Sequence, residues 1–272
     1  MANQFVRTQL LIGQSGLNKL KNARIAVFGI GGVGGHCAEA LARAGVGTLD
    51  IFDDDKVCLS NLNRQIFALH STLGQYKTDA AAARLKDINP NLKLNCHKIF
   101  YSLKTASRID LSVFDFVLDA IDTVSCKIEL ILNCQRANVP IICSMGTGNK
   151  LSAVGFEFAN LFKTSVCPLA KVMRNELKKR GGNDLMVVYS KEQALKPIGC
   201  ENDRAEGFGC DCSENNGDND KIEKDENDCE SVIRGARGSL SRRQTPASIS
   251  FVPPISGLIM AGEAIKYILN RS

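Results

Sequence analysis

The apolar positions of this 272-residue chain cluster in short runs, and longer segments with helical periodicity separate them. An apolar run of about 4–8 residues bounded by polar or glycine positions is typical of a buried strand. In the first 150 residues the pattern predicts strands at 24–29, 48–52, 92–99, 114–120 and 140–144, and helices at 33–45, 74–88 and 123–138. Because the strands alternate with helices, we expect an α/β protein with a doubly wound, mostly parallel sheet.

The second half of the chain changes in character. It predicts a strand at 153–159, a basic helix at 168–180 and a strand at 185–189, then a strand at 249–252 and a helix at 255–269. Between them, residues 199–235 are polar, acidic and poor in aliphatic side chains, which predicts a disordered insert. We therefore divide the chain into a main part, 1–150, and a smaller C-terminal α/β extension, 151–272.

Charge is distributed unevenly along the chain. The net charge is +5, but residues 201–230 hold twelve acidic and three basic side chains, so their local charge is −9 and the remainder carries +14. A body this basic is compatible with a polyanionic partner. A lysine-rich solvated surface would give the same balance, and charge alone does not separate the two.

Eleven cysteines occur without the apolar N-terminal pattern of a secretory signal. They therefore indicate reduced thiols and a cytoplasmic location. Cys37, Cys96, Cys134 and Cys143 lie in apolar patterns that predict burial. The insert adds four more, whose spacing is poor for a zinc site: Cys200, Cys210, Cys212 and Cys229. The apolar segment 251–269 is interrupted by two prolines and carries two charges, so we expect no integral membrane span.

The sequence GIGGVG, residues 29–34, follows the first predicted strand and precedes the first predicted helix. Gly29, Gly31 and Gly34 have the G-x-G-x-x-G spacing, in which backbone N–H groups approach a phosphate at the helix N-terminus; Gly32 lies among them. Asp53, at the end of the second strand, occupies the position of an acid that binds ribose hydroxyls. The main part is thus predicted to be a Rossmann-like nucleotide-binding domain.

The residues around this loop favour ATP over a dinucleotide. Polar side chains follow the second strand, Lys77 follows Gly74, and the fourth strand ends in LDAID with two acids. Cleavage at an α-phosphorus needs donors for the departing pyrophosphate and a carboxylate for Mg²⁺. The sequence therefore predicts a site for ATP and Mg²⁺ built from Asp55, Asn61, Arg64, Gln65, Lys77, Asp119 and Asp122.

Within this set we assign catalytic roles to Arg64, Lys77 and Asp122, with Asp122 as the Mg²⁺ ligand. The sequence does not decide between Asp119 and Asp122 for the metal. Simpler interpretations exist for each residue. Asp122 could cap the following helix, Lys77 could be a solvated helix lysine, and Arg64 could form a loop salt bridge.

Taken together, GIGGVG, the D-x-D after the second strand, SNLNRQ, the downstream lysine and DAID resemble the nucleotide site of the ThiF/MoeB/HesA superfamily, related to ubiquitin-activating enzymes. Members of that superfamily use ATP to adenylate a carboxylate. The segment RTQ, residues 7–9, is similar to one whose arginine reaches into the neighbouring subunit of family dimers. The resemblance implies a homodimer in which Arg7 acts in trans; the alternative is a frayed, solvated terminus.

Four later segments are similar to the tRNA threonylcarbamoyladenosine dehydratases: DAIDTVSCKIEL, CPLAKVMRNELKKRG, VVYSKEQALKP and SISFVPPISGLIMAGEAIKYIL. The resemblance implies ATP-dependent cyclisation of N6-threonylcarbamoyladenosine at tRNA position 37, with ATP converted to AMP and pyrophosphate. The basic residues then become candidate tRNA contacts, although a solvated amphipathic helix would carry the same pattern. The candidates are Lys171, Arg174, Lys178, Lys179, Arg180, Arg242 and Arg243.

Three other functions remain open. The first is an adenylyltransferase for a ubiquitin-like sulfur carrier; such enzymes commonly hold zinc through two C-x-x-C pairs, and this chain has no C-x-x-C. The second is an NAD-dependent oxidoreductase, which would leave Arg64, Lys77 and Asp122 without roles. The third is an RNA-binding module without catalysis. The acidic insert is also a candidate to recruit a basic partner, such as a sulfur-transfer protein related to cysteine desulfurases.

Overall fold

The computed structural model describes residues 3–198 and 246–271. Its strands form one seven-stranded sheet in the order β3-β2-β1-β4-β5-β7-β6, and β6 alone runs antiparallel to its neighbour. The doubly wound, mostly parallel α/β architecture is therefore confirmed. The strands are β1 (Arg24–Phe28), β2 (Thr48–Phe52), β3 (Lys93–His97), β4 (Phe116–Asp119), β5 (Ile141–Ser144), β6 (Phe156–Asn160) and β7 (Met186–Ser190).

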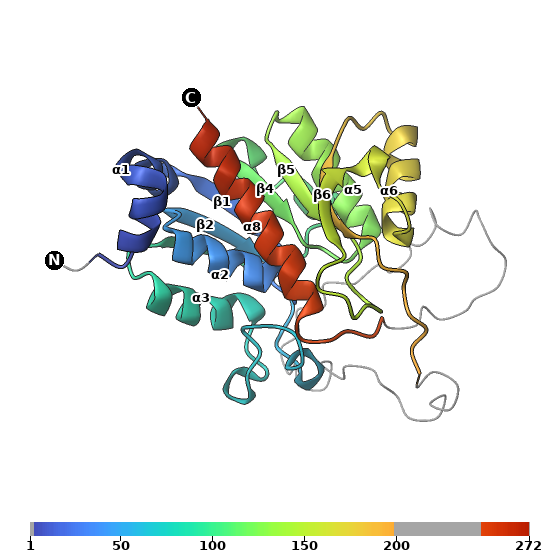
Figure 1. The fold of residues 1–272 in the computed structure, drawn as a ribbon, viewed down its shortest axis with the longest axis horizontal. Helices are drawn as coiled ribbons and strands as arrows, with labels where there is room; N and C mark the ends of the chain where they lie inside the picture. The colour runs from blue at the N-terminus through green and yellow to red at the C-terminus, as the bar shows by residue number, and fades with distance from the viewer. Residues whose placement is uncertain (1–2, 199–245, 272) are drawn as a thin grey trace.

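Helices cover both faces of the sheet (Figure 1). On one face α8 lies beside α2, and α3 follows them; on the other face α5 and α6 pack together. The α-helices are α1 (Val6–Asn22), α2 (Gly34–Ala44), α3 (Lys77–Ile88), α4 (Leu103–Ala106), α5 (Val124–Arg136), α6 (Pro168–Lys179) and α8 (Val252–Asn270). Short 3₁₀ turns are η1 (Leu59–Asn61), η2 (His70–Thr72), η3 (Leu111–Val113) and η4 (Leu161–Lys163).

The central strand β1 is apolar after its first residue, Arg24, and the structure shows why. Ile25 and Val27 belong to the core beneath α2 and α8, whereas Ala26 and Phe28 belong to the core beneath α5. A strand buried on both faces has no polar alternation, as expected for a parallel sheet. The proposed boundary near residue 150 falls between β5 and β6, and both β6 and β7 continue the same sheet.

One expected strand and one expected buried side chain were wrong. Residues 249–251 form no strand, and α8 begins at Val252 with prolines in its first turn. Proline is tolerated there because its missing N–H would have no partner inside the helix. Cys96, expected to be buried, is exposed because β3 is an edge strand; Cys37, Cys134 and Cys143 are buried as predicted.

Helix α8 is long and apolar enough to cross a membrane by length and composition. In the structure it serves as a core helix. A methyl group at Gly257 would lie 2.2 Å from the carbonyl oxygen of Val33, so glycine is required where α8 meets the start of α2. The buried hydroxyls of Ser256 and Ser144 lie 2.7 Å apart and join α8 to β5.

Candidate nucleotide site

A cleft of about 760 Å³ opens at the carboxyl ends of β1, β2, β4 and β5. Strand β1 lies between β2 and β4, so the chain leaves β1 toward one side of the sheet and β4 toward the other. Ligands of open α/β sheets bind at such a switch point. Most of the residues predicted for nucleotide, metal or catalytic roles around this edge line the cleft.

The glycine loop forms one wall of the cleft. Gly29 has φ +85°, a conformation that favours glycine, and its N–H donates to the carbonyl of Phe52 at 2.8 Å. A methyl group at Gly34 would lie 1.8 Å from the carbonyl oxygen of Gly29, so the loop closes against α2 only with glycine there. Gly29, Gly31 and Gly32 line the cleft, and Gly34 lies behind them as the first residue of α2. The arrangement fits a phosphate held at a helix N-terminus.

Asp53 is fastened to the glycine loop. Its carboxylate accepts from the N–H of Ile30 at 2.7 Å and from the N–H of Asp55 at 2.9 Å. Burial raises the pKa of this carboxyl above its ordinary value, against the attraction of Lys77. Asp53 lines the cleft as predicted. Its two hydrogen bonds also hold the glycine loop in its conformation.

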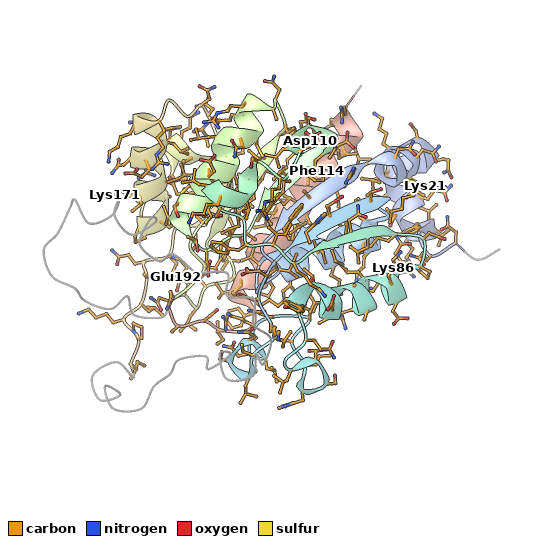
Figure 2. The ribbon with its side chains drawn as sticks, turned by 180° about the vertical axis from the view of Figure 1, so that it is seen from behind. Lys21, Lys86, Asp110, Phe114, Lys171 and Glu192 are labelled. Carbon is orange, nitrogen blue, oxygen red and sulfur yellow. The ribbon has the colours of Figure 1, made fainter. Side chains whose placement is uncertain are left out.

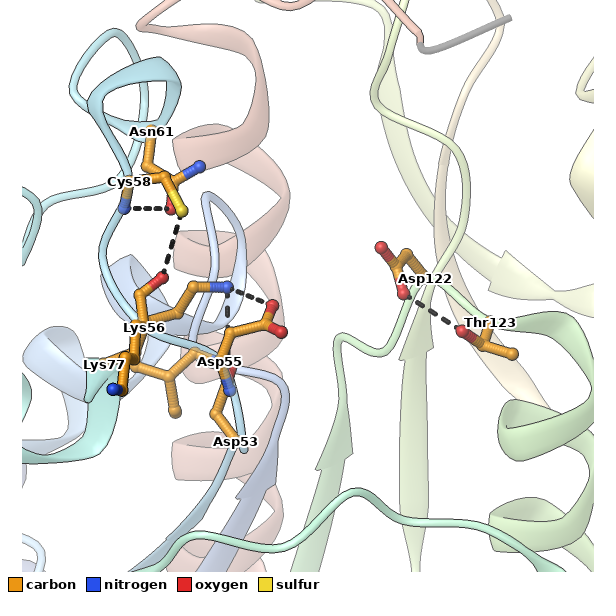
Figure 3. A network of polar contacts seen from close by, with 9 residues as sticks. Asp53, Asp55, Lys56, Cys58, Asn61, Lys77, Asp122 and Thr123 are labelled. Carbon is orange, nitrogen blue, oxygen red and sulfur yellow. Dashed lines mark hydrogen bonds and ion pairs between the residues drawn. The ribbon is translucent and has the colours of Figure 1, made fainter. Parts of the chain in front are cut away.

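Lys77, the first residue of α3, brings a cation into the cleft (Figure 3). Its Nζ lies 2.7 Å from Asp55 Oδ2 and 3.7 Å from Asp53 Oδ1, and the side chain is only 9% exposed. Burial lowers the pKa of Lys77, but Asp53 and Asp55 outweigh it, so the pKa lies above its ordinary value. The ammonium is therefore charged at neutral pH. The interpretation of Lys77 as a solvated helix lysine is wrong.

The loop containing η1 supplies polar groups at the rim. Asn61 and Gln65 are buried, and both line the cleft with Arg64. The Arg64 guanidinium donates to the Ser60 carbonyl at 2.9 Å and to Asn63 Oδ1 at 2.9 Å. These neutral partners orient the guanidinium and leave its positive charge uncompensated by them.

The two acids of LDAID have different environments. Asp119 is fully buried, forms a 2.8 Å ion pair with the equally buried Lys127, and does not line the cleft. Asp122 is exposed on the cleft side opposite Lys77, and its carboxylate accepts from the Thr123 hydroxyl at 3.3 Å (Figure 3). No side chain caps the N-terminus of α5 through a hydrogen bond, so Asp122 does not act as a helix cap there. The sequence left both acids open as a metal ligand, whereas in the structure only Asp122 of the two has its carboxylate at the cleft.

Sequence reasoning missed a second group of cleft residues. The end of β5 contributes Ser144, and the loop after it contributes Thr147 and Gly148. The chain before and within α8 contributes Pro246, Ser248 and Pro253. The aromatic residues Phe52, Phe100 and Tyr101 line another part. For the loop after β5, the sequence offered one signal, which was its position at the carboxyl end of a predicted strand. For the segment before α8 it offered none, because that segment lies about 100 residues further along the chain.

The remaining predicted residues lie outside the cleft. Arg7 is exposed in the first turn of α1. On α6, Lys171, Lys178 and Lys179 are exposed, but Arg174 is half-buried and donates to the Thr164 carbonyl at 3.0 Å. Arg180 Nη2 lies 3.7 Å from Glu176 Oε2. Arg242, Arg243 and the insert cysteines lie outside the described residues.

Comparison with known proteins shows the family to which the chain belongs. The model of the ThiF family matches residues 5–272. The tRNA threonylcarbamoyladenosine dehydratase of Bacillus subtilis is 38% identical over 271 residues, which cover 99% of this chain and 96% of that protein. The molybdopterin-synthase adenylyltransferase of Escherichia coli is 36% identical over 128 residues, which cover 47% of this chain and 51% of that protein.

Among solved structures, that of the Escherichia coli tRNA N6-threonylcarbamoyladenosine dehydratase in complex with ATP is similar to this chain, with a TM-score of 0.76 and 27% sequence identity. The match covers 97% of this chain and 93% of that one. The similarity to dehydratases thus extends over the full length, whereas that to the carrier adenylyltransferase covers about half. The chain belongs to the ThiF family.

Proposed function

We propose that this protein is an ATP-dependent tRNA threonylcarbamoyladenosine dehydratase. It would adenylate the threonyl carboxylate of N6-threonylcarbamoyladenosine at tRNA position 37 and close the ring to the cyclic form. The observation that carries the proposal is the cleft, in which the glycine loop, the Lys77 ammonium and the Asp122 carboxylate converge. The similarity to dehydratases over 99% of the chain favours this substrate over a carrier protein.

Different residues of the chain would bind different parts of ATP. The glycine loop and the N-terminus of α2 would bind phosphate through backbone N–H groups. Lys77 and Arg64 would balance the negative charge that develops as pyrophosphate leaves. A nicotinamide dinucleotide would not require these two cations.

Asp122 is the residue that would hold Mg²⁺. Its carboxylate is exposed toward the cleft, while that of Asp119 is engaged by Lys127 and by the N–H of Ile121 at 3.0 Å. A carboxylate with accessible oxygens suits Mg²⁺, which takes one or two carboxylates together with phosphate oxygens. When bound, the ion would neutralise charge on the phosphates.

The proposed chemistry balances without a nucleophile from the protein. The threonyl carboxylate oxygen attacks the α-phosphorus, and the bond to pyrophosphate breaks. The carbamoyl oxygen of the same nucleoside then attacks the activated carbonyl carbon, AMP leaves, and a proton is lost from the carbamoyl nitrogen. Because the second attack is intramolecular, positioning supplies most of its acceleration. The net change in the nucleoside is the loss of one water.

Pyrophosphate release tests this function against the alternative. We expect ATP to be consumed with tRNA that carries N6-threonylcarbamoyladenosine, and not with unmodified tRNA. Stimulation only by a ubiquitin-like carrier ending in Gly-Gly would contradict the proposal and support the adenylyltransferase. Nicotinamide binding without pyrophosphate release would instead support an oxidoreductase.

We further propose that exposed lysines of α6 contact tRNA phosphates. Lys171 is exposed, and Figure 2 shows it at the opposite end of the molecule from Lys21. Lys171→Ala is expected to raise KM for tRNA about two- to fivefold and to flatten its salt dependence, since one phosphate contact is lost. Lys21→Ala, an equally exposed lysine on α1, is the matched control. Equal effects of both substitutions would remove α6 from the interface.

A homodimer with Arg7 acting in trans is also part of this proposal. Arg7 does not line the cleft of its own chain, and on the same helix Leu10 and Leu11 are 84% and 85% exposed. Apolar side chains this exposed are suited to burial against a second copy. A tRNA substrate and the six free cysteines among the described residues favour the cytoplasm, although Cys58 is disulfide-bonded and departs from the expectation of reduced thiols throughout. The sulfur-transfer partner stays a prediction, because the insert lies outside the described residues.

Mixed dimers test the trans role. Arg7→Ala and Asp122→Ala are each expected to be inactive alone. If Arg7 completes its partner's site, random re-pairing of the two variants restores about a quarter of wild-type activity, because half of the dimers then contain one intact site of two. No recovery in dimers shown to be mixed would assign Arg7 to its own subunit or to no catalytic role.

A further inference from the structure

The chain before α8 crosses the cleft between two loops that are distant in sequence. Pro246 and Ser248 both line the cleft. The carbonyl of Ser248 accepts from Asn63 Nδ2 at 3.0 Å on one side, and Pro246 packs against Gly148 on the other. Figure 1 shows this short red segment running from the start of α8 toward the carboxyl ends of the strands. Residues 246–248, the crossing segment, therefore join the SNLNRQ loop to the loop after β5.

Hydrogen bonds from one residue hold this segment. The N–H of Asn149 donates to the Ala247 carbonyl at 2.7 Å, and Asn149 Oδ1 accepts from the N–H of Ala247 at 2.7 Å. Pro246 and Ala247 are exposed, so burial of apolar side chains contributes little to their position. Backbone and side chain of Asn149 thus form a two-sided clasp on Ala247.

Asn149 also binds the other chain segment that borders the region 199–245. Its carbonyl accepts from the N–H of Leu195 at 2.8 Å. Its φ is +58°, in the left-handed region where asparagine, aspartate and glycine are tolerated and other residues are strained. The residue type therefore supplies both the backbone conformation and the acceptor oxygen.

Close packing beside the clasp leaves the crossing segment little freedom. A methyl group at Gly148 would lie 2.7 Å from Cβ of Pro246 and 3.3 Å from the carbonyl oxygen of Ala247. Because a proline ring in contact with backbone cannot move aside independently, any added volume must displace the segment itself.

We infer that Asn149 is a positioning residue that holds the crossing segment as a wall of the cleft, on the side where the nucleoside carboxylate meets ATP. This inference rests on the proposed function. Ser248 and Thr147 both line the cleft, and each carries a hydroxyl group. Hydroxyl groups suit the carbamoyl and hydroxyl groups of the threonylcarbamoyl substituent, which donate and accept hydrogen bonds.

Two substitutions separate the parts of the clasp. Asn149→Gly keeps the backbone conformation and removes Oδ1, whereas Asn149→Asp keeps both. We expect Asn149→Gly to raise KM for modified tRNA about three- to tenfold, the effect of one lost hydrogen bond, with KM for ATP and Tm close to wild type. Asn149→Asp should stay within about twofold of wild type. Gly148→Ala should reproduce the defect of Asn149→Gly by displacing the segment.

Hydrogen exchange supplies a readout that does not depend on the reaction. In the full-length protein, the amide of Ala247 should exchange faster in Asn149→Gly than in wild type or in Asn149→Asp. Unchanged exchange would overturn the clasp. Faster exchange with unchanged KM and kcat for tRNA would overturn its positioning role. If wild type itself does not turn over modified tRNA, the proposed function fails, while the exchange experiment still decides whether Asn149 holds the wall.

Discussion

Asp122→Ala is expected to lower the rate of pyrophosphate release by about 10²–10³-fold while tRNA binding is retained. Asp122 faces the cleft and is exposed, so its removal leaves neither a cavity nor a buried unpaired group. The reason for the loss is chemical: the carboxylate that would hold Mg²⁺ on the phosphates is gone. Single-turnover pyrophosphate release and a filter-binding measurement with modified tRNA check the two halves of this prediction.

Asp87→Ala is the matched control, because Asp87 is an equally exposed acid on α3 away from the cleft. It should retain full activity. If Asp122→Ala turned over normally, Asp122 would not be the metal ligand. If it lost tRNA binding as well, its role would be in binding the substrate and not in the reaction.

Lys127→Met is expected to destabilise the protein by about 3–5 kcal/mol, because it leaves the Asp119 carboxylate buried without its cation. Both side chains of this pair are 0% exposed. Lys127 Nζ also donates to the carbonyl of Ile121 at 3.0 Å, and Asp119 accepts from the N–H of the same residue. The pair therefore holds the residue that precedes Asp122, so activity should fall in the fraction that remains folded. Denaturant unfolding measures the loss of stability.

The double variant Lys127→Met with Asp119→Asn should recover much of that stability, because no buried charge remains. Lys266→Met is the exposed comparison: its pair with Glu263 on α8 is 2.7 Å long, but the lysine is 68% exposed. That substitution should cost about 0–1 kcal/mol. If Lys127→Met and Lys266→Met lowered the free energy of unfolding equally, the buried pair would contribute no more to stability than the exposed pair.

The sheet and the glycine loop could be predicted because their signals are local. Strands β1 and β2 were bounded within a residue by their apolar runs, and the glycine spacing follows directly from how closely the loop approaches α2. The helix α1 was missed. Its Leu10 and Leu11 are exposed within this chain, so the apolar stripe that usually marks a core-facing helix is absent from its first half.

Other features depended on burial, which sequence spacing does not report. Asp119 and Asp122 are equivalent candidates by position, and they are distinguished only by burial: Asp119 is paired with a buried lysine, whereas Asp122 is exposed and lines the cleft. Arg174 shares the helical spacing of Lys171 and Lys178 but turns to carbonyl groups near Thr164. The clasp between Asn149 and Ala247 joins residues too far apart in the sequence for any local pattern to reveal it.

Dehydratase activity is tested most directly by mass spectrometry of nucleosides from tRNA treated with the purified protein. With ATP and Mg²⁺, tRNA carrying N6-threonylcarbamoyladenosine should yield a nucleoside lighter by one water, with stoichiometric AMP and pyrophosphate; in the same time the Asp122→Ala protein should yield about 10²–10³-fold less. If the nucleoside mass stays unchanged while a Gly-Gly carrier is adenylated under the same conditions, the protein is a carrier adenylyltransferase and the proposed dehydratase function is contradicted.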